Sequence, residues 1–293
     1  MAPRVAMVEW LLEPLGYAFM QRGLLAAVVV GVVCALVGVF MMLRGMAFMG
    51  EALGHAVLPG LAIGYLASGG NRTITFFWAL GTAILTSVVM GALSRTTKLR
   101  QDTAIGIVFA GMFALGIALI SSIRSYAVDL THMLFGNILG VTNGDMWMVL
   151  AASAAVILAL VLFYKELTVI AFDPVLAVTL RLPVRGLDIL LHVMIAVAIV
   201  VSLQTVGVAL VVAMLLTPAA TAFMLTKQLK RMMVIAALVA AFSGVAGLYA
   251  SYYLNIASGA AIVLACTTVF VLVYIFRGRE RSKVALQQKS PAG

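Results

Sequence analysis

The chain has 293 residues, of which 64% are hydrophobic and only 10% are charged, and its mean hydropathy is +1.17. A soluble globular domain carries about 25% charged residues, so this composition excludes a soluble protein and predicts an all-α polytopic membrane protein. A bilayer-spanning helix needs about 20 mostly apolar residues. The length therefore fits roughly eight or nine transmembrane helices in one domain, residues 1–293, with no separate soluble domain.

The formal net charge is +9. The basic residues are scattered between apolar runs, which argues against nucleic acid as a partner and favours membrane lipid headgroups.

Apolar runs mark the predicted spans in chain order. They lie at about 18–43, 46–66, 74–94, 101–123, 146–164, 188–226, 231–253 and 256–277. The run 188–226 is too long for one crossing. It predicts two crossings, or one crossing and a re-entrant segment, with Thr217-Pro218 as the break because proline lacks a backbone N–H.

Basic clusters orient the predicted bundle, because cytoplasmic loops carry an excess of Lys and Arg. This rule places on the cytoplasmic side the segments 94–100, 164–188, 226–231 and 277–283. The C-terminus is then cytoplasmic, and we expect residues 278–293 to form a flexible basic tail. Nine helices place all of these segments on the cytoplasmic side and the N-terminus outside. A count of eight helices requires a re-entrant segment to do the same.

Small residues recur within the apolar runs. Glycines at helical spacing let helices approach closely in a bilayer, which predicts a packing role for Gly31, Gly38, Gly45, Gly50, Gly54, Gly60 and Gly64. Cys34 and Cys266 also lie inside apolar runs. Such thiols behave as small hydrophobic groups, so we expect no structural disulfide.

The stretch MGEALGHAVLPG contains the most unusual polar residues of the sequence, Glu51 and His55, followed by Pro59. Residues four apart lie on the same face of a helix, and an acidic residue in mid-span costs about 2.5–3.5 kcal/mol. A carboxylate and an imidazole on one face form a plausible ligand pair for a divalent first-row metal. An intrahelical hydrogen bond between the two side chains explains the spacing equally well. Pro59 leaves the carbonyl of His55 without its usual helical donor.

Two ligands make an incomplete metal site. A homodimer with this helix near its two-fold axis supplies two carboxylates and two imidazoles, and two-fold pairing is the commonest oligomeric state. The other histidines are weaker candidates. His132 lies beside Asp129 in a predicted external segment, and His192 lies near Asp188, where we expect a structural role.

A second motif lies in the predicted cytoplasmic segment 164–188. Asp173 and Pro174 form a helix start, with Asp as the N-cap and Pro at the first position. The helix should run to about Leu180 and end at the turn Leu182-Pro183. Its apolar residues, which include Val178 and Leu180, suit docking against another protein. The alternative is an amphipathic linker on the membrane surface.

Several stretches together resemble the membrane subunit of ABC importers for manganese, zinc and ferrous iron. They are VGVFMMLRGMAFMGEALGHAVLPG, LFGNILGV, FDPVLAVTLRLPV and VGVALVVAMLLTPAATA, which occur in the family order. The resemblance implies a type II ABC importer-like bundle, a permease homodimer in the prokaryotic cell membrane, two cytoplasmic ATPase subunits and an extracytoplasmic metal-binding protein. It also implies that Glu51 and His55 bind the transported metal, and that about Asp173 to Val184 forms the coupling helix seated on the ATPase. The family usually has Asp where this chain has Glu51.

The resemblance also implies that the chain is not itself an enzyme. It contains no G-x4-G-K-[ST] motif, so ATP is expected on the partner subunit, and no bound cofactor is expected. Hard oxygen ligands and the HAVLPG form favour Mn²⁺ as the transported ion, with Zn²⁺ next and Fe²⁺ as a further alternative. A proton-coupled metal transporter would carry several intramembrane acids, and a purely structural membrane subunit would not need Glu51 and His55 on one face.

Overall fold

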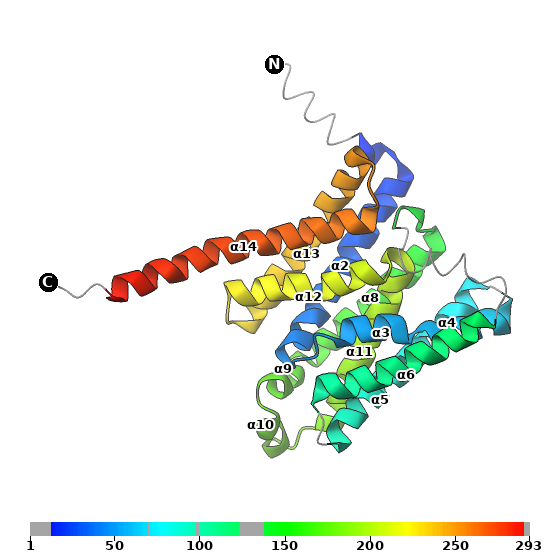
Figure 1. The fold of residues 1–293 in the computed structure, drawn as a ribbon, viewed down its shortest axis with the longest axis horizontal. Coiled ribbons are helices and arrows are strands. Elements are labelled where there is room, and N and C mark those ends of the chain that lie inside the picture. The colour runs from blue at the N-terminus through cyan, green and yellow to red at the C-terminus, as the bar shows by residue number, and fades with distance from the viewer. Residues whose placement is uncertain (1–12, 70, 98–99, 123–137, 290–293) are drawn as a thin grey trace.

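The computed structural model describes residues 13–69, 71–97, 100–122 and 138–289, and the regular elements in these ranges are all helices (Figure 1). In chain order they are η1 (Pro14–Gly16), α2 (Ala18–Leu43), α3 (Met49–Ala56), α4 (Leu58–Ser68), α5 (Arg72–Thr96), α6 (Gln101–Ser121), η2 (Ile138–Gly140), α8 (Asn143–Leu162), α9 (Tyr164–Phe172), α10 (Pro174–Thr179), α11 (Val184–Val206), α12 (Val208–Leu225), α13 (Leu229–Leu254) and α14 (Ser258–Lys289). The predicted all-α fold is confirmed.

Helix length and composition identify the membrane spans. Among the described residues, seven helices are long and apolar enough to cross a bilayer: α2, α5, α6, α8, α11, α13 and α14. The shorter apolar helix α12 is a further candidate for a pass. Helices α3 and α4 follow one another with a single residue between them. The described part of the chain is therefore a multi-pass membrane protein, in agreement with the predicted eight or nine helices.

The long apolar run 188–226 divides into two helices, as expected, but not at Thr217-Pro218. The break lies at Gly207, whose φ of 83° and ψ of 161° fall in a region that glycine adopts readily. Pro218 stays inside α12. A break at Gly207 gives helices of 23 and 18 residues, whereas a break at Pro218 would leave a second piece too short to span. A proline is tolerated within a transmembrane helix because neighbouring groups compensate for its missing N–H.

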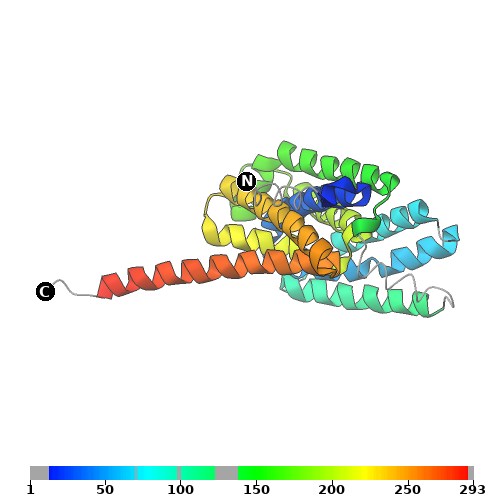
Figure 2. The same ribbon diagram turned by 90° about the horizontal axis from the view of Figure 1, so that it is seen from above.

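The helices differ in depth within the bundle. In their most apolar windows, α2 is 67% buried and α11 is 72% buried, whereas α6 and α14 are each 17% buried. Figure 2 shows α6 and α8 on opposite sides of the bundle, and α14 projecting past the other helices. The fold is thus built around α2 and α11, with α6 and α14 at its periphery.

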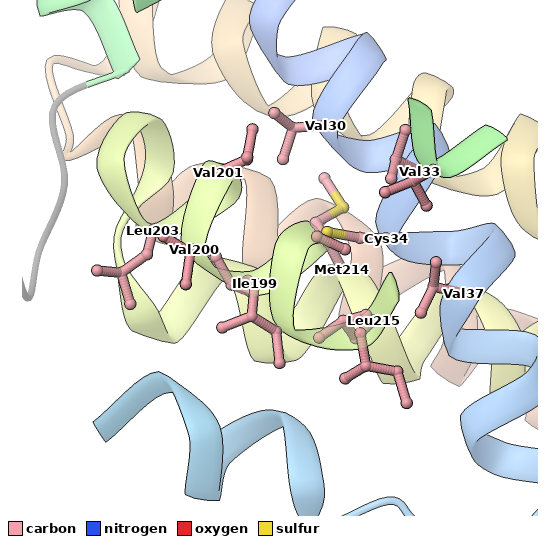
Figure 3. Packing of buried hydrophobic residues seen from close by; sticks show 14 of the residues in the cluster. Val30, Val33, Cys34, Val37, Ile199, Val200, Val201, Leu203, Met214 and Leu215 are labelled. Atoms are coloured by element: carbon pink, nitrogen blue, oxygen red, sulfur yellow. The ribbon is translucent and has the colours of Figure 1, made fainter. Parts of the chain in front are cut away.

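Side chains from α2, α11 and α12 interlock at the centre of the bundle. Figure 3 shows Val30, Val33 and Val37 of α2 among Ile199 and Val201 of α11 and the buried residues of α12. Cys34 is fully buried there, and its Sγ lies 3.2 Å from the Ser202 Oγ. Cys34 and Cys266 are both free thiols, as the sequence predicts.

Most of the singled-out glycines do mark close helix contacts. A Cβ at Gly38 would collide with the backbone carbonyl of Leu215, and a Cβ at Gly64 would lie 2.8 Å from the Thr75 Cα. Gly31, Gly50, Gly54 and Gly60 also face neighbouring helices. Gly45 is the exception, because no atom lies within 4 Å of its added Cβ and its φ is +68°. Gly45 is a turn residue, so the prediction of a packing role was wrong there.

The last helix extends further than the sequence analysis expects. Helix α14 continues to Lys289, through most of the segment predicted to be a flexible tail from residue 278. The residues after Gly278 are mainly good helix formers such as Arg, Glu, Ala, Leu, Gln and Lys. They can therefore prolong the helix beyond its apolar part.

The contact at Gly38 gives a stability prediction. Gly38→Ala should lower the free energy of unfolding by about 1–3 kcal/mol, because the added methyl group forces α2 away from α12. Gly81→Ala is the matched control, since a Cβ at this glycine of α5 meets open space. The control should be neutral or stabilising by about 0.4–1 kcal/mol. Thermal unfolding of the purified protein in detergent measures both variants, and equal midpoints would contradict the packing argument.

Candidate functional site

Helix α3 carries Glu51 in its first turn and His55 in its last turn. The two residues lie one helical turn apart on the same face. The Glu51 side chain is exposed and the His55 side chain is half-buried, while most of the neighbouring residues of α3 are buried. The helix therefore presents an acid and an imidazole along its partly open face.

Two aromatic side chains of α6 lie beside the His55 ring. The ring centroid of Phe113 lies 5.6 Å from that of His55 in an edge-to-face arrangement, and the Phe109 centroid lies 6.3 Å away. The His55 Nδ1 is buried and has no hydrogen-bond partner. No hydrogen bond joins Glu51 to His55, although both residues are described. The intrahelical hydrogen bond considered from the sequence is thus absent.

Glu51 and His55 have the side-chain types that a divalent first-row metal binds. A buried polar atom without a partner costs about 1–3 kcal/mol, and a divalent ion bound by the imidazole and the carboxylate would offset that cost. Within the described residues, no group of three or more His, Cys, Asp or Glu side chains could hold a metal ion. Glu51 and His55 are therefore two candidate ligands with no third such side chain beside them in the described part of the chain.

The helix is interrupted directly after these residues. Helix α3 ends at Ala56 and α4 starts at Leu58, with Pro59 in its first turn. The predicted apolar run 46–66 is thus divided at Val57 into two helices. The peripheral helix α6 supports the junction, since a Cβ at Gly116 would lie 2.6 Å from the Leu58 Cβ and 3.1 Å from the Pro59 Cδ. The carbonyl groups near His55 consequently lie at a helix end rather than within a continuous helix.

The short helix α10 forms as the sequence predicts. The Asp173 side chain accepts hydrogen bonds from the backbone N–H groups of Val175 and Leu176, at 3.0 and 2.9 Å, and Pro174 is the first helical residue. Ala177 is buried against Ile170 and Leu187. The outward side of the segment is apolar and open to solvent, with exposed side chains at Val175, Leu176, Val178 and Leu180. Leu182 is half-buried and Pro183 is exposed in the turn that follows. In Figure 1, α10 protrudes from one end of the bundle.

An ionic cluster lies at the same end of the bundle, and the sequence analysis did not predict it. Asp188 of α11 is only 4% exposed. Its Oδ1 accepts a 2.5 Å hydrogen bond from the guanidinium of Arg44, the residue directly after α2. Its Oδ2 forms an ion pair with Arg95 of α5. Burial lowers the pKa of Arg44 from its ordinary value, but an arginine stays charged in proteins. The only sequence signal was an acid at the edge of an apolar run, which does not identify its partners.

The remaining polar candidates have structural surroundings or fall outside the described residues. The His192 Nδ1 lies 2.7 Å from the backbone carbonyl oxygen of Asp188, and the Ser87 hydroxyl donates to the carbonyl of His192. These bonds agree with the structural role expected for His192. His132 and Asp129 lie outside the described residues.

The family of the chain follows from comparison with known proteins. Residues 16–277 match the ABC 3 transport family. This match covers most of the chain, so the protein belongs to the ABC 3 transport family. The resemblance drawn from the sequence motifs is thereby confirmed.

Individual relatives cover almost the whole chain. The manganese transport system membrane protein MntC of Halalkalibacterium halodurans is 43% identical over 266 residues, which are 91% of this chain and 90% of that protein. A probable iron transport system membrane protein of Haemophilus influenzae is 38% identical over 270 residues, covering 92% and 98%. The solved structure of PsaBC from Streptococcus pneumoniae in complex with Fab superposes with a TM-score of 0.80 at 37% identity, covering 92% of this chain and 95% of that one.

The N-cap of α10 can be tested directly. Asp173→Ala should remove about 1 kcal/mol of local stability by leaving two backbone N–H groups without an acceptor, whereas Asp173→Asn retains an acceptor oxygen. Hydrogen–deuterium exchange of the peptide 173–182 should be several-fold faster in Asp173→Ala than in Asp173→Asn. Equal exchange in the two variants would mean that the cap does not hold the helix.

Proposed function

We propose that this protein is the permease subunit of an ATP-driven importer for divalent transition-metal ions, with Mn²⁺ as its main substrate. The observation that carries the proposal is the unpartnered Nδ1 of His55 on the same helix face as the exposed carboxylate of Glu51. A polar pair inside a membrane span is costly and is a functional site by default. Membership of an ABC transport family and relatives named for manganese transport support this reading.

A homodimer completes the metal site in this proposal. The two ligands of one protomer lie on a partly open face, and a two-fold axis beside α3 brings two carboxylates and two imidazoles together. Four such ligands suit a divalent ion of four to six ligands, about the range that first-row metals adopt. Glu51 and His55 then bind one ion between the protomers along the translocation path.

The ligand set favours manganese only in part. Carboxylate oxygens suit Mn²⁺, and imidazole suits zinc and iron as well. The intrinsic affinities of most sites run against manganese, so selectivity must come from geometry and from the absence of thiolate. Relatives named for manganese support Mn²⁺, and the relative named for probable iron transport keeps Fe²⁺ as the second candidate. Zn²⁺ has no specific observation in its favour beyond the ligand types.

The partners follow from the same proposal. The exposed apolar side of α10 seats on a cytoplasmic ATPase subunit, which binds and hydrolyses ATP, so that this chain acts as a transport subunit and not as an enzyme. An extracytoplasmic metal-binding protein delivers the ion at the opposite end of the bundle. The basic end that carries α10, together with the C-terminus, then faces the cytoplasm of a prokaryotic cell.

The metal ligands are tested by transport. In proteoliposomes that contain the permease, its ATPase and its binding protein, Glu51→Gln and His55→Ala should each reduce Mn²⁺ uptake at least a hundredfold, because each removes a ligand type from the site. Uptake is measured with radioactive Mn²⁺, and competition by Fe²⁺ and Zn²⁺ ranks the metals.

Glu13→Gln is the matched control, since it makes the same chemical change at an exposed residue before η1. This variant should transport like the wild type. Normal uptake by both Glu51→Gln and His55→Ala would refute the site assignment, and stronger competition by Zn²⁺ or Fe²⁺ than by unlabelled Mn²⁺ would refute the choice of metal.

The docking role of α10 gives a separate prediction. Val178 is 65% exposed, and a charge there would be buried unpaired in an apolar interface. Val178→Glu should therefore reduce co-purification of the ATPase at least tenfold. Leu254→Glu, a comparable change at a residue 67% exposed at the end of α13, should leave it unchanged. Equal recovery of the ATPase with both variants would place the docking surface elsewhere.

A further inference from the structure

We propose that Asp188 is the positioning residue through which α10 and α3 move together, so that displacement of the coupling helix changes the geometry of the metal ligands. This inference rests on the proposed function, because it assumes that α10 meets the ATPase and that α3 binds the metal. It adds that Asp188 and Arg44 physically connect helix α10 to helix α3.

The first link joins α10 to the start of α11. Ala177 of α10 packs with Leu187 of α11 and Ile170 of α9 in a small apolar cluster separate from the main core. The turn between α10 and α11 is short and hydrogen-bonded, since the Leu182 N–H donates to the Ala177 carbonyl at 3.0 Å. A displacement of α10 therefore carries Leu187, and with it the adjacent Asp188.

The second link is the ion pair itself. The Asp188 side chain is 5% exposed, and the side chains of Arg44 and Arg95 are 19% and 35% exposed. A buried carboxylate that loses its partners becomes an uncompensated charge, which is strongly unfavourable. The arginines must then follow the carboxylate, and a shift of the first turn of α11 is passed to the ends of α2 and α5.

The third link joins Arg44 to α3. Between them lies a short connection held by backbone hydrogen bonds, from the Met46 N–H to the Met41 carbonyl at 2.9 Å and from the Met49 N–H to the Met46 carbonyl at 3.0 Å. Met46 is fully buried, and α3 starts at Met49 with Glu51 in its first turn. Arg44 is thus joined to the metal-bearing helix by a short segment that backbone hydrogen bonds hold in place.

Arg95 differs from Arg44 in the helix to which it belongs. It lies in the last turn of α5, from which the chain leads to α6 rather than to α3. The two arginines pair with the same carboxylate, yet only Arg44 precedes the metal-bearing helix. The comparison of the two arginines therefore separates a connection along the chain into α3 from one through α5 and α6, whose Phe109 and Phe113 lie beside His55.

The experiment compares Arg44→Gln with Arg95→Gln in proteoliposomes that hold the complete transporter. The measured quantity is the number of Mn²⁺ ions imported per ATP hydrolysed, together with thermal stability and ATPase co-purification for each variant. Arg44→Gln should lower the ratio of ions to ATP at least tenfold, and Arg95→Gln should keep it within twofold of the wild type. Normal ratios for both variants would show that the Asp188 cluster is only structural. Equally reduced ratios would show that the connection does not run through Arg44 alone, and either result would overturn the proposal.

A second variant tests the connection if Arg44→Gln does not assemble. One glycine inserted after Gly45 keeps all three charged side chains and lengthens the link to α3, in a turn where Gly45 has a φ of +68°. The insertion should lower the ratio of ions to ATP at least fivefold, and an unchanged ratio would overturn the proposal. A failure of the metal assignment is distinguishable, because it would be seen as normal uptake in Glu51→Gln whatever the result for Arg44.

Discussion

The close packing of α2 against α12 is the contact on which the rest of the structure depends. In a bilayer the lipid tails are as apolar as the side chains, so helices associate mainly through close packing. Gly38 allows the backbone of α2 to meet the Leu215 carbonyl directly. With α2 held at the centre among α11, α12 and α13, the segment that follows it enters α3 at a fixed place. The positions of Glu51 and His55 are consequences of this packing.

The two polar regions of the protein differ in whether their buried polar atoms have partners. Asp188 is almost fully buried, and both of its carboxylate oxygens have cationic partners. His55 has a buried nitrogen without any partner. The paired charges of Asp188 hold helices together, whereas a buried nitrogen without a hydrogen-bond partner costs about 1–3 kcal/mol. This contrast is why the proposal takes the face of Glu51 and His55, and not the Asp188 cluster, as the metal site.

The candidate site of Glu51 and His55 lies beside the central helices and is covered by a peripheral one. The deeply buried helices α2 and α11 form the central part of the bundle, and the half-buried aromatic residues Phe109 and Phe113 of the peripheral helix α6 cover His55. The interruption at Val57 and Pro59 separates α3 from α4. A short helix between a proline break and a tight turn can change its orientation with less disturbance of its neighbours than a continuous span.

The sequence by itself determined the features that depend on neighbouring residues. Hydropathy identified the spans and Asp173-Pro174 predicted the capped helix, because each signal lies within the segment that it governs. The tertiary structure alone decided that Gly45 forms a turn and that the hydrogen bond between Glu51 and His55 is absent. It also decided that Asp188 pairs with two arginines. Residues 44, 95 and 188 are far apart in the chain, and only the packing of α2, α5 and α11 brings their charges together.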